Sequence, residues 1–324
     1  MFVLMINSVE AQDNSLNLFN INESKTHNRN EEFRKSVDDA IVFNINKEIY
    51  TSISEERKNS FTLTIPMYSG EKKYAVLERF DILTPDVRFI EKSASGEKEL
   101  DLRNLTLSYK GKIAGEDKSF VTVTLYDGSI VGLIESGNEK YVIGALKDKN
   151  NMDTKDIILY QHSKLKEGRK FKCGTDESGI SDDMLRKMQE INGMHTDLST
   201  SSLLVAKVAI DVDFFTYGIY GNSVPNATAY ALAIMASASA VYVKDENVKL
   251  TVSYLRVWTV QDPYTSTGGS ALLTQFRNEW VANQGSVDRA IAHLISRRNN
   301  LDVAGIAYLN VLCNPNFGYG LSAT

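Results

Sequence analysis

The sequence is poor in cysteine, histidine and proline for its length of 324 residues. Two cysteines exclude a disulfide-dense scaffold, and five prolines exclude a proline-rich linker protein. Four histidines limit any metal chemistry within the chain. The formal net charge of −5 argues against a nucleic-acid-binding protein, which would normally carry a basic face. No uninterrupted run of 18 apolar residues occurs, so the sequence predicts no membrane span.

The composition that remains is globular, with 43% hydrophobic and 24% charged residues, and the length favours two domains. At the N-terminus, a short apolar run precedes Val9-Glu10-Ala11, which is similar to a small-residue cleavage site. We therefore interpret residues 1–11 as the remnant of a signal peptide and expect a secreted, extracellular protein. The alternative is an ordinary frayed N-terminus. Residues 12–35 are rich in Asn, Ser and Glu, which predicts poor order.

The first half of the chain predicts short antiparallel strands. Apolar residues alternate with polar ones over 61–65, and similar runs follow with turn residues between them. Asp127-Gly128 and Gly137-Asn138 are hairpin turn signals. The expected strands lie near residues 61–65, 74–77, 105–109, 120–125, 130–134 and 141–143. Residues 147–172 are polar and basic and predict a solvated linker, while 182–192 predict a short amphipathic helix.

The second half alternates strand and helix patterns. Strands are expected over 208–214, 250–260, 290–295 and 305–312, and an alanine-rich helix over 227–242. A second helix follows Gly268-Gly269-Ser270, with Leu272, Leu273, Phe276 and Trp280 on one face. This order predicts a mostly parallel sheet with crossover helices. The predicted fold class is therefore an α+β region rich in antiparallel β, followed by an α/β domain, with a boundary near residue 197.

Two parts of the chain resemble a known family. The segment Tyr109–Leu146 is similar to the propeptide of adamalysin/reprolysin-type zinc metallopeptidases. The segments Arg256–Thr259, Asp262–Tyr264, Ala290–Ser296 and Gly305–Leu309, with Cys313, are similar to the first half of their metzincin catalytic domain. The resemblance covers roughly residues 60–324. It implies a β-rich propeptide with a cysteine-switch segment over 12–196, and the N-terminal part of an incomplete catalytic domain over 197–324.

The zinc motif of that family is missing from the chain. Metzincins bind zinc with H-E-x-x-H-x-x-G-x-x-H, in which the glutamate is the general base. The histidines here are His27, His162, His195 and His293, and no pair has that spacing. The resemblance thus implies a zinc cofactor whose ligands are not in this chain. No catalytic residue is assigned, the chain alone is expected to be inactive, and the motif is expected beyond Thr324.

The two cysteines are the candidate site residues. By resemblance, Cys173 is the cysteine switch, a thiolate that occupies the open fourth position on zinc, and Lys170 and Lys172 would favour the thiolate. The alternatives are an unpaired linker cysteine or a disulfide with Cys313. For Cys313 the resemblance implies a disulfide with a cysteine downstream of Thr324, and the alternative is a buried free thiol.

Several other residues favour structural roles. His293 lies among apolar residues of an expected strand and is predicted to be a core or edge histidine. Asp211 and Asp213 could contact calcium, but a solvated strand face is the favoured interpretation. Trp258, Tyr264 and Trp280 are predicted to be packing residues.

Two functions follow from these observations. The first is the precursor fragment of a secreted zinc-dependent metalloendopeptidase that acts on protein or peptide substrates, with a contact between its propeptide and catalytic domain. The second is a secreted non-catalytic module that binds or inhibits another protein through the β-rich half.

Overall fold

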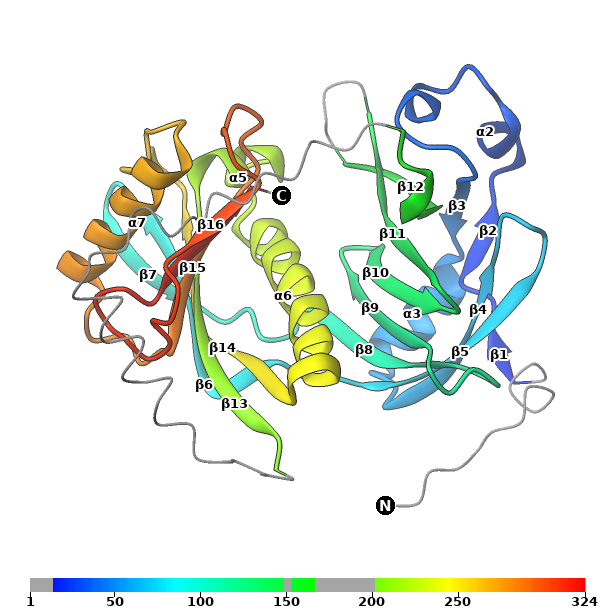
Figure 1. Ribbon diagram of the computed structural model, residues 1–324, viewed down its shortest axis with the longest axis horizontal. Helices are drawn as coiled ribbons and strands as arrows, with labels where there is room; N and C mark the ends of the chain where they lie inside the picture. Colours follow the sequence, from blue (N-terminus) through cyan, green and yellow to red (C-terminus); the bar gives the residue numbers. More distant parts are fainter. Residues whose placement is uncertain (1–13, 149–152, 167–201, 324) are drawn as a thin grey trace. The chain divides into compact units, whose positions relative to one another are not determined.

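The computed structural model describes residues 14–148, 153–166 and 202–323, which form two compact units (Figure 1). Within these residues, the first unit comprises 14–81, the described part of 103–166, and Leu232–Ala240. The second unit comprises Ile82–Leu102, 202–231 and 241–323.

The first unit is built on a ten-stranded sheet in the order β1-β4-β5-β8-β9-β10-β11-β12-β3-β2. All neighbouring strands are antiparallel except β1 and β4. Because β2 also contacts β4, the two ends of the sheet approach each other. The strands are β1 (Ser15–Leu16), β2 (Phe19–Ile21), β3 (Ile41–Ile45), β4 (Ser60–Pro66), β5 (Lys72–Arg79), β8 (Thr106–Ile113), β9 (Phe120–Tyr126), β10 (Ser129–Ser136), β11 (Glu139–Lys147) and β12 (Asp153–Gln161). The short helices are α2 (Glu23–His27), η1 (Glu32–Lys35), α3 (Lys47–Glu55) and η2 (His162–Lys164).

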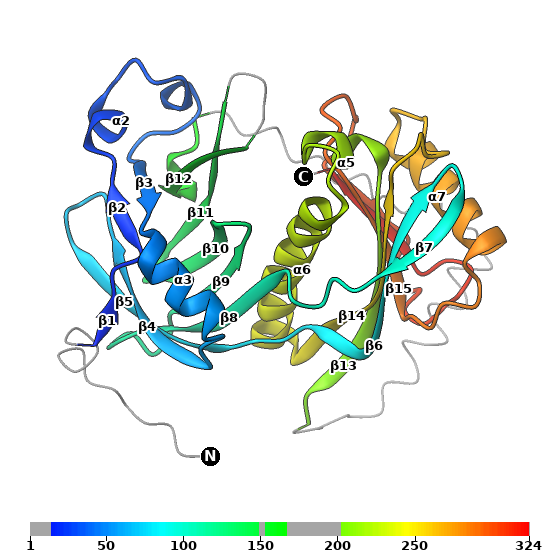
Figure 2. The same ribbon diagram turned by 180° about the vertical axis from the view of Figure 1, so that it is seen from behind.

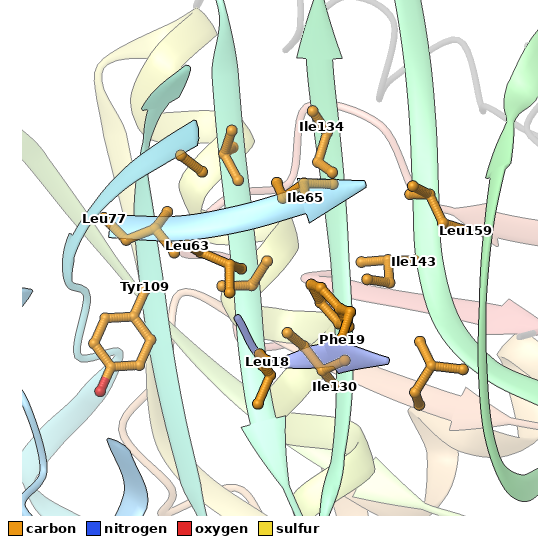
Figure 3. Packing of buried hydrophobic residues seen from close by; sticks show 14 of the residues in the cluster. Leu18, Phe19, Leu63, Ile65, Leu77, Tyr109, Ile130, Ile134, Ile143 and Leu159 are labelled. Carbon is orange, nitrogen blue, oxygen red and sulfur yellow. The ribbon is translucent and has the colours of Figure 1, made fainter. Parts of the chain in front are cut away.

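The core of this unit consists of inward-facing strand residues, as period-two alternation requires (Figure 3). The predicted strands near 61–65, 74–77, 105–109, 120–125, 130–134 and 141–143 are all confirmed. Asp127 and Gly128 both have positive φ, 45° and 71°, which matches the two-residue turn that joins twisted strands. Helix α3 adds Ile53, which has no exposed surface, to the same core.

Two predictions for the first half are wrong. Poor order was predicted over 12–35, but residues 14–35 form β1, β2, α2 and η1. The predicted linker over 147–172 contains β12, which is inserted between β11 and β3. The run Ile157-Ile158-Leu159 is buried there, and that burial outweighs the polar flanks that suggested a linker.

The second unit is built on a seven-stranded sheet in the order β16-β17-β15-β13-β14-β6-β7. The five central strands are parallel, and only the edge strands β16 and β7 run antiparallel to their neighbours. This confirms the mostly parallel sheet predicted for the second half. The strands are β6 (Leu83–Ser93), β7 (Gly96–Leu100), β13 (Leu204–Val212), β14 (Val248–Trp258), β15 (Ile291–Ser296), β16 (Gly305–Ala307) and β17 (Tyr319–Ala323). Its helices are α5 (Phe214–Ile219), α7 (Gly269–Asn283) and the two ends of α6 (Val224–Glu246), whose residues 232–240 group with the first unit.

Both predicted helices of the second half are present. The side chain of Ser223 caps α6 by accepting from the backbone N–H of Asn226, and Asn247 ends the helix in the left-handed region. By length and composition α6 could cross a membrane, with a mean hydropathy of 1.3, but 56% of that window is buried inside the structure. A buried core helix has the same composition. Helix α7 buries the predicted apolar face, Leu272, Leu273, Phe276 and Trp280.

The strand predicted over 305–312 is too long. Strand β16 ends at Ala307, because Asn310 and Cys313 adopt positive φ values of 55° and 62° and Leu312 is exposed. The next strand is β17, which buries Tyr319 and Leu321 beside β15. The structure also adds to the predicted domain layout, since β6 and β7 lie inside the predicted pro-region and yet belong to the second sheet (Figure 2).

Candidate functional site

The two cysteines chosen from the sequence differ in what the structure shows of them. Cys173 lies outside the described residues, as does the predicted helix over 182–192. Cys313 is exposed in the turn after β16 and forms no disulfide within the part of the chain that the structure describes. The alternative of a buried thiol at Cys313 is therefore wrong, and the disulfide stays a prediction.

The described residues do not fit a zinc site. Across 14–148, 153–166 and 202–323, no three histidine, cysteine, aspartate or glutamate side chains are grouped so that they could hold a metal ion. His27 Nε2 lies 2.9 Å from Glu23, one helical turn away in α2. His293 Nε2 lies 3.0 Å from the Ser322 hydroxyl. Burial lowers the pKa of His293 to about 4, so this imidazole is neutral at pH 7 and fits the predicted structural role.

A fully buried carboxylate, Asp211 on β13, lies at the centre of the second unit. It accepts hydrogen bonds from Arg256 Nη2 at 2.7 Å and Arg256 Nε at 3.2 Å. The indole N–H groups of Trp258 and Trp280 donate to it at 3.0 and 2.9 Å. The Tyr264 hydroxyl donates at 2.6 Å. A buried charge is tolerated only when paired and hydrogen-bonded, and this site meets both conditions.

Arg256 supplies the compensating charge from the neighbouring strand β14, directly opposite Asp211 in the parallel ladder. Its side chain has no exposed surface, and its Nη1 also lies 3.2 Å from Glu279 and 3.4 Å from Glu97. Burial works against the charged guanidinium, but the Asp211 carboxylate, with smaller contributions from Tyr264 and Tyr254, raises the pKa of Arg256 above its ordinary value. The guanidinium thus remains a fixed positive charge in the core.

The aromatic residues around this ion pair have the packing role predicted for them, whereas Asp211 and Asp213 do not lie on the predicted solvated face. Trp258 and Trp280 stack on the Arg256 guanidinium, with ring centroids 4.6 and 5.6 Å from its central carbon. They are packing residues, as predicted. The solvated face predicted for Asp211 and Asp213 is wrong, because both side chains have no exposed surface. Strand β13 is central in the sheet, and its residues 208–212 are all buried.

A second polar cluster lies where three parallel strands end. Asp213 follows β13, Asp262 follows β14, Ser296 is the last residue of β15, and Arg298 comes two residues later. Arg298 bridges the two carboxylates, with Nε 3.1 Å from Asp213 and Nη2 3.1 Å from Asp262. The Ser296 hydroxyl donates to Asp213 at 2.6 Å. Burial raises the pKa of Asp262, and the neighbouring Asp213 carboxylate raises it further against the opposing effect of Arg298.

The position of this cluster is the place where open α/β sheets bind ligands, at the carboxyl ends of their strands. Its groups are nevertheless already paired. Asp213 also caps α5 by accepting from the backbone N–H of Thr216 at 2.8 Å, and Asp262 accepts from the backbone N–H of Phe214 at 2.8 Å. The arrangement therefore orders the strand ends and the start of α5, and it offers no free base.

Sequence reasoning missed the two arginines that organise these clusters, Arg256 and Arg298. One signal was available for Arg256. Arg256 lies between Leu255 and Val257 on β14, and both of these neighbours are buried. A charged residue inside such a strand requires a buried partner.

A cavity of about 770 Å³ lies in the first unit. Charged side chains of both signs line it, and two of them pair directly, Lys166 with Asp38 at 2.8 Å. Ligand pockets are usually mostly apolar with a few convergent polar groups, which this cavity does not resemble.

Known proteins match the chain over part or most of its length. Residues 228–324 match the family model described as Metallo-peptidase family M12B Reprolysin-like. The mouse (Mus musculus) protein named "A disintegrin and metallopeptidase domain 3" is 24% identical to this chain over 289 residues, which cover 85% of this chain and 33% of that protein. The chain thus spans about a third of the length of this relative. The crystal structure of metalloproteinase-II from Bacteroides fragilis has 11% identity and a TM-score of 0.42, covering 85% of this chain and 79% of that one.

Proposed function

We propose that this chain is the precursor segment of a secreted zinc-dependent metalloendopeptidase. The family match and the mouse relative confirm its predicted resemblance to the reprolysin-type metallopeptidases. One observation carries the proposal. The matched residues, 228–324, supply β14, α7, β15, β16 and β17, which are the larger part of the parallel sheet and its crossover helix. The sequence likeness therefore covers four of the seven strands of this sheet.

Strand β16 is the element on which we propose that a peptide substrate binds. An extended peptide can add to the free side of an edge strand through backbone hydrogen bonds. Within the residues that the structure describes, β16 is one edge of the second sheet and consists of Gly305, Ile306 and Ala307. The opposite edge, β7, carries Glu97, Lys98 and Glu99, and charged side chains protect an edge from unwanted pairing.

The residues of this chain supply the scaffold of the proposed enzyme rather than its metal site. The Asp211–Arg256 pair fixes the register of β13 against β14, and Arg298 fixes the ends of β13 and β15. Because the described residues do not fit a zinc site, we propose that the 324-residue chain alone cleaves no peptide bond.

The test is to read the coding sequence downstream of codon 324 and to assay the complete product on an unfolded protein substrate. The expected result is an encoded H-E-x-x-H-x-x-G-x-x-H motif and cleavage that a metal chelator abolishes. Unrelated sequence after a stop codon, together with no cleavage, would contradict the proposal. That outcome would leave the alternative of a secreted non-catalytic binding module.

We also propose that Cys173 keeps the complete precursor latent, because a thiolate can fill the open coordination position that the attacking water needs. The Cys173→Ala change should raise the activity of the uncleaved precursor. Cys313→Ala is the control, since it changes the other cysteine of this chain and should leave the uncleaved precursor as inactive as the unmodified one. Equal, near-zero activity in all three proteins would show that Cys173 does not block the site.

A further inference from the structure

Strands β6 and β7 come from the N-terminal part of the chain but are built into the sheet of the second unit (Figure 2). Strand β6 pairs in parallel with β14, and β7 pairs antiparallel with β6 as the outer strand of the hairpin. The chain enters this hairpin after Asp81 and leaves it before Arg103, and both of these flanking residues belong to the first unit.

The hairpin is part of the hydrophobic core of the second unit. Phe89 and Ile90 are consecutive strand residues, so their side chains point to opposite faces of the sheet, and both are buried, with 1% and 3% exposure. Ile90 lies opposite Arg256 in the ladder and belongs to the same core cluster as Trp258 and Trp280. The hairpin thus fills space on both faces and does not merely cover an edge.

Backbone contacts hold β6 at both of its ends. The backbone N–H of Val252 donates to the carbonyl of Ile82 at 2.7 Å, and that of Thr259 donates to the carbonyl of Lys92 at 2.9 Å. These bonds flank the paired part of the parallel ladder, in which Tyr254 lies opposite Arg88 and Trp258 lies opposite Lys92.

One side chain of the hairpin also enters the buried ion-pair network. Glu97 Oε1 on β7 lies 3.4 Å from Arg256 Nη1 and accepts from Gln284 Nε2 at 3.0 Å. Another glutamate of the same strand, Glu99, pairs with Arg88 at 2.9 Å, where both side chains are more than half exposed. Glu97 therefore contacts the core charge, whereas Glu99 lies at the surface.

We propose that the β6–β7 hairpin, residues 83–100, is a clasp that keeps the N-terminal part of the chain bound to the second unit after the chain is cut between residues 167 and 201. Such a cut breaks none of the ladder, core or Glu97 contacts, because the hairpin is connected to the first unit through Asp81 and Arg103. Release then requires extraction of β6 from the sheet or further cuts beside the hairpin. This inference does not depend on the proposed peptidase activity.

The test uses the full chain with a recognition sequence for a specific protease inserted between residues 167 and 201. After cleavage, size-exclusion chromatography in native buffer should show both fragments in one peak, and urea should separate them. Glu97→Gln should raise the dissociation rate about tenfold, because a charge-assisted contact to buried Arg256 is weakened. Glu99→Gln, the matched control on the same strand, should change that rate by less than about twofold.

Hydrogen exchange of the cut, unmodified protein gives a second readout that does not require any variant to fold. The amides of β6 that pair with β14 should stay as protected as in the uncut chain. Separation of the fragments in native buffer would overturn the proposal. Co-elution with rapidly exchanging β6 amides would overturn it too, because other contacts would then hold the fragments.

Discussion

Asp211 has no exposed surface, and Arg256 Nη2 lies 2.7 Å from its carboxylate. The Asp211→Asn change should lower the free energy of unfolding by about 3–5 kcal/mol, because it leaves the buried Arg256 without its main partner. Urea unfolding of the full chain measures this loss. Asp288→Asn is the control, since Asp288 pairs with Lys207 at 2.6 Å but is 79% exposed, and it should leave stability nearly unchanged. Equal effects would contradict a central role for Asp211.

His293 predicts a pH dependence of stability at the same scale. Its pKa of about 4 in the folded state lies below the ordinary value of about 6.5, so the unfolded chain takes up the proton first as the pH falls. The stability contributed by neutral His293 is therefore complete above about pH 6.5 and is lost towards pH 4.

Between pH 7.5 and pH 5, the unmodified chain should lose about 1–2 kcal/mol more unfolding free energy than His293→Gln does. The control is Ser322→Ala, which removes the 3.0 Å contact but keeps the imidazole, and it should retain the slope. Parallel pH profiles for the unmodified chain and His293→Gln would show that burial does not hold the imidazole neutral.

Residue types alone predicted which aromatic side chains pack, but not which charges are buried. Trp258, Tyr264 and Trp280 are large and apolar, so their burial follows from composition. The burial of Asp211 depends on Arg256, which lies 45 residues away in the sequence. No local pattern contains that pairing, and the aspartates therefore resembled a solvated face.

Among the elements, strands β9 and β10 of the first sheet depend on a close backbone approach at Gly132. A Cβ at Gly132 on β10 would lie 2.3 Å from the carbonyl oxygen of Thr122 on β9, whereas one at Gly144 on β11 would meet only Val131 at 3.8 Å. Gly132→Ala should therefore lower the unfolding free energy by about 1–3 kcal/mol, and Gly144→Ala should be tolerated. Thermal unfolding of both variants measures the difference, and equal midpoints would contradict the predicted close approach.

Elements with a strong period were predictable, and elements that depend on tertiary partners were not. The face of α7 and the strands around Asp127-Gly128 followed from spacing and turn chemistry. Strand β6 was missed because Pro85 and several charges interrupt its apolar pattern, and its place beside β14 is a long-range pairing. Strand β17 was missed because only alternate residues of a short segment are large and apolar.

At the scale of the whole molecule, the sequence indicated two halves of different texture, and the structure contains two sheets of different kinds. The boundary is not a single point in the chain, because residues 82–102 belong to the second unit although they lie between β5 and β8 of the first sheet. Composition shifts mark places along a chain and do not reveal such an exchange of strands. The activity of a complete protein remains a proposal, since the chain spans about a third of its mouse relative.

The central proposal is that the described residues form part of a metallopeptidase scaffold and hold no metal site. Its most direct test is the zinc content of the purified 324-residue chain. After dialysis against zinc-free buffer, metal analysis should find far less than one zinc per chain, on the order of 0.1, because tight binding requires a preorganised set of three or four ligands. The same preparation should cleave no peptide. About one tightly held zinc per folded chain would contradict the account, because a ligand set would then exist among the residues of this chain.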